Sequence, residues 1–165
     1  MKKIIVATIG FVLFFVNIYS QSDSAKMNPV DPTSKMFETK IYMQVDTLVY
    51  KLRKGNFYVT EDNQAMIMAL PISQPLDSVK AQMQNDAKKK NVKIKQESEY
   101  IENDRRTIFK MGEFHDNGKT AVIELFAIEA TPNKTILVTS VYLLKDKDFF
   151  VHKAGKAAAT ARIIE

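Results

Sequence analysis

The longest regular hydrophobic pattern in the chain spans residues 120–144, TAVIELFAIEATPNKTILVTSVYLL. Two runs of β-branched and aromatic residues flank a Thr-Pro-Asn-Lys turn at 131–134, and this arrangement predicts a β-hairpin. If the four turn residues are unpaired, Val141 lies opposite Glu124. Both faces of the hairpin are then mostly apolar, whereas a sheet with one face in water alternates polar and apolar residues. We therefore expect a covering layer on each face.

Shorter apolar runs before this hairpin predict further strands, separated by tight turns rich in Gly, Asn and Asp. The strongest turn signal is Asn117-Gly118. As a two-residue turn it pairs Met111 with Glu124 and makes residues 92–144 a four-stranded antiparallel meander. Pro71 is expected to end the strand that precedes it. The predicted strands are Ile41–Val45, Leu48–Leu52, Phe57–Thr60, Ala65–Leu70, Val92–Ile101 and Arg105–Phe114.

Ser73–Lys90 has apolar residues at the three- and four-residue spacing that predicts an amphipathic helix. Pro75 suits its first turn, and Ser73 or Asp77 can cap it. The predicted buried stripe is Leu76, Val79, Met83 and Ala87.

A second helix is predicted from Asp148 to about Arg162. Gly155 costs this helix about 1 kcal/mol relative to alanine, so we expect a packing reason for it. The apolar stripe is rich in alanine, which indicates close contact with the sheet. Together these elements predict an α+β fold, an antiparallel meander flanked by helices in an α/β/α sandwich. The stripe includes Phe150, Ala154, Ala157, Ala158 and Ala161.

The N-terminal region has a different pattern from the rest of the chain. A basic head, an apolar run over residues 4–16 and a polar end with Ser20 at a plausible cleavage position predict a signal peptide over residues 1–20. An uncleaved N-terminal anchor is the alternative. Residues 21–40 are polar, contain two prolines and predict a flexible segment. Residues 41–165 are expected to form one domain.

Composition narrows the class of protein. The chain has 165 residues and no cysteine, so a disulfide framework and lipid attachment through cysteine are excluded. Removing Lys2 and Lys3 with the signal peptide lowers the net charge from +5 to +3. That bias is too weak for a typical nucleic-acid-binding protein. We expect an exported protein, periplasmic or secreted, with no stable transmembrane segment after cleavage and no nucleic-acid partner.

Glu124 is the residue that fits the hairpin least well. A carboxylate within an apolar run favours a position near a sheet edge, with a lysine or arginine partner. If it is buried instead, its pKa rises, as in many catalytic acids and bases. Glu113 can lie on the same face, so the pair is a candidate for hydrolase chemistry, although no enclosing motif supports it.

The densest basic cluster lies at the end of the first helix and is a candidate site for an anionic envelope component. Cations at a helix C-terminus also stabilise the helix dipole, and the pattern favours that structural role. Neither His115 nor His152 has a second ligand at metal spacing, and no glycine-rich phosphate loop is present, so no metal or cofactor is expected. The cluster consists of Lys88, Lys89, Lys90, Lys93 and Lys95.

The order of elements resembles the PsbP-like fold, with Gly55-Asn56-Phe57 and Leu70-Pro71 as local matches over residues 49–164. This fold occurs in photosystem II extrinsic proteins, a Ran-binding nuclear import factor and small bacterial envelope proteins. The chain lacks the tryptophan often found near the first strands of that fold. Cystatin-like and nuclear-transport-factor-like folds are the competing possibilities, but their main helix usually precedes most strands.

The resemblance implies a protein that presents a surface to a partner. We therefore expect a noncatalytic exported accessory or binding protein of the bacterial envelope, with an envelope protein or an anionic envelope component as partner. The alternatives are a small hydrolase that uses Glu124 or Glu113, and an anion-binding module that uses the basic cluster.

Overall fold

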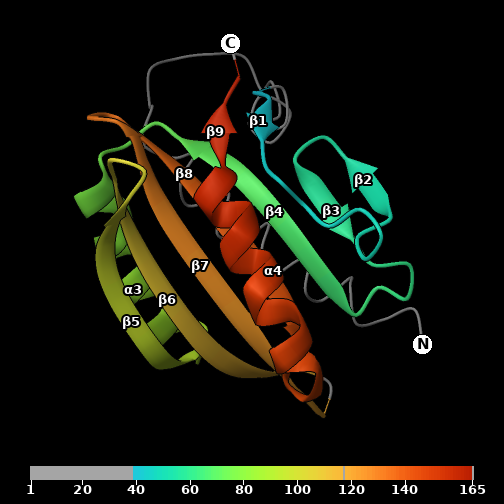
Figure 1. Ribbon diagram of the computed structural model, residues 1–165. Coiled ribbons are helices and arrows are strands. Elements are labelled where there is room, and N and C mark those ends of the chain that lie inside the picture. Colours follow the sequence, from blue (N-terminus) through green and yellow to red (C-terminus); the bar gives the residue numbers. More distant parts are fainter. Residues whose placement is uncertain (1–38, 117, 165) are drawn as a thin grey trace, which may run out of the picture.

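A seven-stranded antiparallel sheet forms the centre of the molecule, in the strand order β2-β3-β4-β8-β7-β6-β5 (Figure 1). The computed structural model describes residues 39–116 and 118–164. A separate short ladder pairs β1 (Ile41–Tyr42) with β9 (Arg162–Ile163). The central strands are β2 (Leu52–Lys54), β3 (Phe57–Val59), β4 (Ala65–Ile72), β5 (Lys93–Glu102), β6 (Arg105–Asp116), β7 (Lys119–Thr131) and β8 (Lys134–Leu143).

Two helices cover opposite faces of the sheet: α4 crosses in front of it and α3 lies behind it (Figure 1). Helix α3 spans Leu76–Lys89, and α4 spans Lys147–Thr160 after the 3-10 turn η1 (Leu144–Asp146). The predicted α+β sandwich is confirmed, as is the four-stranded meander β5-β6-β7-β8. The two faces of the sheet are named here the α3 face and the α4 face.

The α3 face is packed by large aliphatic side chains. The predicted stripe of α3 is buried in full and contacts residues such as Ile123 and Leu125 of β7. Pro75 occupies the cap position of the helix without a side-chain hydrogen bond, so capping by Ser73 or Asp77 is wrong. Apolar burial, rather than a cap, therefore positions this helix.

The α4 face is packed closely by small side chains of the helix. Ala154, Ala157, Ala158 and Ala161 are all buried, as the stripe predicted. Their size lets the helix backbone approach the sheet. Gly155 does not take part in this contact, because a Cβ at that position would meet nothing within 4 Å. The expected packing reason for Gly155 is wrong.

The central hairpin has a register that differs from the prediction. Thr131 pairs with Lys134, but the register shifts between Glu129 and Thr131, and Ser140 lies opposite Glu124 instead of Val141. The extra residue is a β-bulge, and a shift by one residue exchanges the faces of a strand. The side chains of β8 therefore point to the faces opposite to those predicted.

Other strand boundaries also depend on tertiary context. Strand β4 continues through Pro71, which pairs with Ile136 of β8. On the other side of β4, the pairing with β3 ends at Met68. No described strand lies there beside Pro71 to require the backbone N–H that proline lacks. The predicted strand Leu48–Leu52 does not form: the Asp46 carbonyl accepts hydrogen bonds from the N–H groups of Val49 and Tyr50, and only Leu52 belongs to a strand, β2.

The predicted signal peptide and nearly all of the flexible segment 21–40 lie outside the described residues. They remain predictions, as does the single-domain boundary at residue 41. Within residues 39–116 and 118–164, no helix is long and apolar enough to cross a membrane.

Candidate functional site

Glu124 lies in the middle of β7 and points to the α4 face, with 1% of its surface exposed. Strands β6 and β8 flank it, where Met111 and Ser140 are its direct neighbours. The predicted pairing with Met111 is confirmed. A position near an edge with a lysine or arginine partner is wrong, because β7 is an interior strand and Glu124 forms no ion pair within the described part of the chain.

Three hydroxyl groups surround this carboxyl group. Ser140 is the cross-strand neighbour of Glu124, Tyr142 is two residues further along β8, and Tyr50 approaches from the segment before β2. The Tyr142 hydroxyl is close enough to affect the Glu124 carboxyl, but no hydrogen bond of good geometry joins them. Around Glu124, five buried oxygens make no hydrogen bond of good geometry with the described residues: both carboxyl oxygens of Glu124, Oγ of Ser140, and the hydroxyls of Tyr50 and Tyr142.

Burial raises the pKa of Glu124 to about 7. The nearby Tyr142 hydroxyl and the Lys147 ammonium at the start of α4 oppose this effect. Burial also raises the pKa values of Tyr50 and Tyr142, so both remain protonated at neutral pH. Glu124 can therefore hold or release a proton near neutrality, which is the property of a general acid or base.

Access to Glu124 is blocked by α4 and its aromatic contacts. Phe150 of α4 stacks on Tyr142 at 5.5 Å between ring centroids and lies 6.0 Å from the Tyr50 ring. An open depression lies at the end of the sheet, but Glu124 does not line it; its lining includes Lys119, Thr120 and Leu143. A substrate would reach Glu124 only if α4 moved.

Glu113 lies on the same face as Glu124, as predicted, since it pairs with Val122 of β7. Its environment is different. Glu113 is half-buried, and its Oε2 lies 3.2 Å from Nζ of Lys95. The structure thus places one carboxyl group in a closed interior and the other in an ion pair at the surface, so the two do not form an open two-carboxylate site.

The predicted basic cluster lies where α3 ends and β5 begins, and it is less uniform than its sequence indicates. Lys95 is paired with Glu113. Lys90 is half-buried, and burial lowers its pKa while the nearby Asp86 raises it. The other three lysines, Lys88, Lys89 and Lys93, are exposed. Binding of an anion by this cluster remains a prediction.

The histidines lie apart from each other. His115 is at the end of β6, where its Nδ1 lies 2.9 Å from Oγ1 of Thr120, and His152 is exposed on α4. Among the residues that the structure describes, no group of three His, Cys, Asp or Glu side chains is placed to hold a metal ion.

Sequence reasoning missed two buried features. Lys110 of β6 is 1% exposed on the α3 face, with Nζ 2.9 Å from Oε1 of Glu97 on β5. Lys110 is two residues after Ile108 in the same strand and therefore shares its face, which was the signal for this position. The Ser140 and Tyr142 hydroxyls beside Glu124 were missed because the predicted register put Val141, rather than Ser140, opposite it.

A scan with protein-family models finds no match, and neither does a comparison with curated proteins. Among solved structures, LpqN of Mycobacterium tuberculosis, described as involved in cell envelope biogenesis, matches with a TM-score of 0.56 at 13% identity. The match covers 76% of this chain and 83% of LpqN. PA94 of Pseudomonas aeruginosa, a protein of unknown function described as a putative regulator, matches with a TM-score of 0.54 at 11% identity, over 84% of this chain and 85% of that one.

The solution structure of cyanobacterial PsbP from Synechocystis sp. PCC 6803 matches with a TM-score of 0.48 at 8% identity, over 86% of this chain and 99% of that one. At such identities the likeness concerns the fold alone. The three layers and the meander β5-β6-β7-β8 are those predicted from the sequence, whereas β9 was not predicted: the last helix ends at Thr160 instead of about Arg162. The chain shares its fold with LpqN and PA94.

Proposed function

We propose that this protein is a noncatalytic, exported accessory or binding protein of the bacterial envelope. The observation that carries the proposal is the closed interior of the sandwich. Its most unusual side chain, Glu124, is sealed beneath α4, which leaves the outer surface as the region where a partner can bind.

Two further observations support an envelope location. The first twenty residues have the pattern of a signal peptide. The structure also shares its fold with LpqN, a protein described as involved in cell envelope biogenesis. The absence of cysteine means that the fold needs no oxidising compartment to form, so export does not conflict with its stability.

The hydrolase alternative makes a different demand on the same residue. A hydrolase that uses Glu124 needs its carboxyl group, whereas a binding protein needs only the volume that the side chain fills. Glu124→Gln keeps this volume and removes the titrating group. The variant therefore separates the two functions.

The test begins with cell fractionation and mass measurement of the protein. We expect the processed chain, without the predicted signal peptide, in the envelope fraction. Crosslinking in intact cells should then capture the same envelope partner with the wild type and with Glu124→Gln. Recovery in the cytoplasm with an intact N-terminus would contradict the proposal, and so would turnover of an envelope substrate that is lost in Glu124→Gln.

A further inference from the structure

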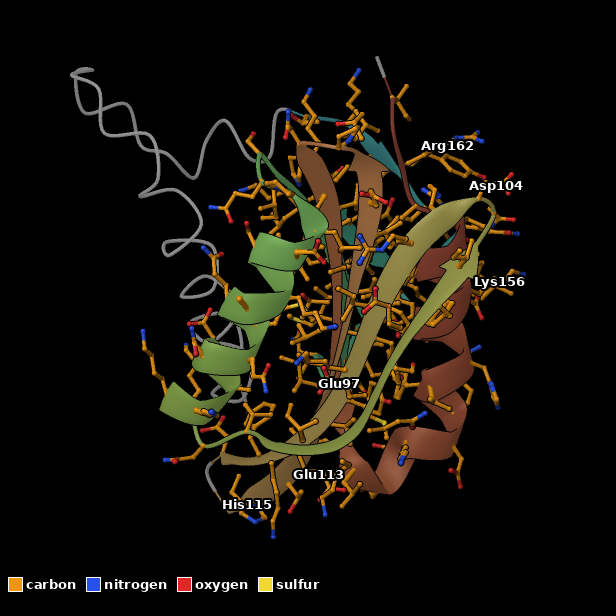
Figure 2. The ribbon with its side chains drawn as sticks, turned by 90° about the vertical axis from the view of Figure 1, so that its left-hand side faces the viewer. Glu97, Asp104, Glu113, His115, Lys156 and Arg162 are labelled. Atoms are coloured by element: carbon orange, nitrogen blue, oxygen red, sulfur yellow. The ribbon has the colours of Figure 1, made fainter. Side chains whose placement is uncertain are left out.

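Within the part of the chain that the structure describes, strand β5 forms one edge of the central sheet and pairs with β6 alone. Figure 2 looks onto this edge, with α3 on one side of it and α4 on the other. All ten residues of the strand are exposed or half-buried, and Ile101 is 74% exposed. An exposed edge of this length presents unpaired backbone N–H and C=O groups to another strand.

The charges of β5 fall into two groups. Three are paired within the molecule. Lys95 pairs with Glu113, and Glu97 pairs with Lys110. Glu99 pairs with both Lys80 and Arg106. The other two charges, Lys93 and Glu102, form no ion pair in residues 39–116 and 118–164. They have opposite signs and occupy the two ends of the strand.

A bulge in β5 decides which side chains share a face. Ile94 pairs with Gly112 and Gln96 pairs with Met111, so Lys95 is the extra residue. In a regular strand, Ile94 and Ile101 would point to opposite faces, since they are seven residues apart. The bulge places both on the α3 face, and for the same reason it places Lys93 and Glu102 together on the α4 face.

We propose that β5 is a self-complementary docking edge, which pairs antiparallel with β5 of a second copy of this chain. With Ser98 opposite Ser98 of the second copy, Gln96 lies opposite Tyr100. Beyond the bulge, Ile94 meets Ile101 and Lys93 meets Glu102 of the second copy. The Ser98 pair lies on the two-fold axis, and each of the other contacts occurs twice around it. The two seven-stranded sheets become one continuous sheet.

This register brings together the groups that the single chain leaves unmatched. The two unpaired charges find partners of opposite sign, and the exposed isoleucines cover each other. One pair of like charges also becomes opposite, Glu97 and Glu99 of the second copy, but both carboxylates are already neutralised by the cations of their own chain. Because of the bulge, this register sets Ile94 opposite Ile101 and Lys93 opposite Glu102 at the same time.

The other edge of the sheet lacks this property. Strand β2 has three residues, two of which are the cations Arg53 and Lys54. Antiparallel pairing of β2 with itself would bring like charges together. The contrast assigns the second copy to β5, and it provides a matched control at β2.

Sedimentation equilibrium of the purified protein, with charge reversals at the strand ends, tests the proposal. We expect a monomer–dimer equilibrium, and we expect Lys93→Glu and Glu102→Lys each to raise the dissociation constant about tenfold or more, because like charges then face each other twice. The double variant K93E/E102K should dimerise like the wild type. An equimolar mixture of the two single variants should form heterodimers, since their end charges are complementary.

Crosslinking tests the register in the same protein. The chain has no cysteine, so Ser98→Cys introduces one thiol at the two-fold axis. We expect an oxidant to give a disulfide-linked dimer at micromolar protein, and we expect Lys54→Cys on β2 to remain monomeric. The proposal is overturned if the wild type is monomeric at about millimolar concentration, if neither charge reversal changes the equilibrium, or if Lys54→Cys crosslinks as fast as Ser98→Cys.

Discussion

The two faces of the central sheet are packed by different chemistry. On the α3 face, aliphatic side chains of the helix and the sheet form the core, and the buried Lys110 has its carboxylate partner in Glu97. On the α4 face, a helix rich in alanine lies close to an aromatic cluster that encloses Glu124. The carboxyl group there makes no hydrogen bond of good geometry with the described residues, although the Tyr142 hydroxyl lies close to it.

The difference shows that burial alone does not define a core. A buried polar group is stabilising only when its hydrogen bonds are made, and an unpaired one loses its hydration without compensation. The α3 face meets this condition at Lys110, whereas the α4 face does not meet it at Glu124. We therefore expect the α3 face to provide most of the stability, and Glu124 to make the contribution of the α4 face depend on pH. Burial also raises the pKa of Asp86 on α3.

The largest effect should come from a cavity on the α3 face. Met83 of α3 is fully buried, so Met83→Ala removes packed atoms and leaves a void. We expect a loss of about 2–5 kcal/mol in the free energy of unfolding, measured by urea denaturation. Gln84→Ala, on the exposed side of the same helix turn, should change it by less than about 0.5 kcal/mol. Equal effects of both substitutions would contradict the assignment of the α3 face as the main core.

The second effect is the pH dependence of the α4 face. The pKa of Glu124 is raised from 4.5 to about 7 by folding, so the folded state binds its proton more tightly than the unfolded state. This contribution is fully present below pH 4.5 and is lost as the pH rises towards 7. It amounts to about 3 kcal/mol, because each pKa unit corresponds to about 1.4 kcal/mol.

Glu124→Gln removes this titration. The measurement is therefore the free energy of unfolding of the variant minus that of the wild type, at several pH values. This difference in unfolding free energy should increase as the pH rises from about 4.5 to 7, because only the wild type loses stability there. This difference cancels the pH dependence of groups that both proteins share. One of them is Glu99, whose pKa is lowered to about 2 by hydrogen bonds from Lys80 and Arg106, so that its contribution to stability changes with pH in the opposite direction. A difference that does not vary with pH would show that Glu124 is not titrating in a closed interior.

A smaller effect should follow from a larger side chain between α4 and the sheet. Ala157 is fully buried where the helix approaches the sheet, so Ala157→Leu needs space that the sandwich lacks. We expect a loss of about 1–3 kcal/mol by thermal or chemical unfolding. The neighbouring Lys156 is exposed, and Lys156→Leu should be nearly neutral. Tolerance of leucine at both positions would mean that the close contact of α4 is not required.

The smallest effect should be a gain. Gly155 lies within α4 beside open space, so Gly155→Ala adds helix propensity without a clash. We expect an increase of about 0.5–1 kcal/mol in unfolding free energy. A decrease in unfolding free energy would mean that α4 needs glycine at this position to pack, which would contradict the open space beside Gly155.

The sequence predicted the parts of the fold that depend on local patterns. The stripe from Leu76 to Ala87 identified the buried side of α3, and the alanines of α4 identified its close contact with the sheet. The Asn-Gly turn predicted the register that pairs Met111 with Glu124. In each case the signal lies within a few residues, because helix periodicity and turn chemistry are properties of the local chain.

The tertiary structure decided the features that need distant segments. The bulge between Glu129 and Thr131 changed which side chain lies beside Glu124, and its position depends on how β8 fits between β7 and β4. Pro71 stays within its strand only because β3 is short.

The partners of Glu124 show the same division. The apolar neighbours of Glu124 in the sequence indicated that its carboxyl group is unusual. They did not indicate that Tyr50, which lies 74 positions earlier in the chain, would pack over it together with Phe150 of α4. Local sequence thus determined the elements and their buried sides. Only the packing of segments that are far apart in the chain decided strand register, side-chain partners and the closure of the interior, because these depend on which surfaces meet.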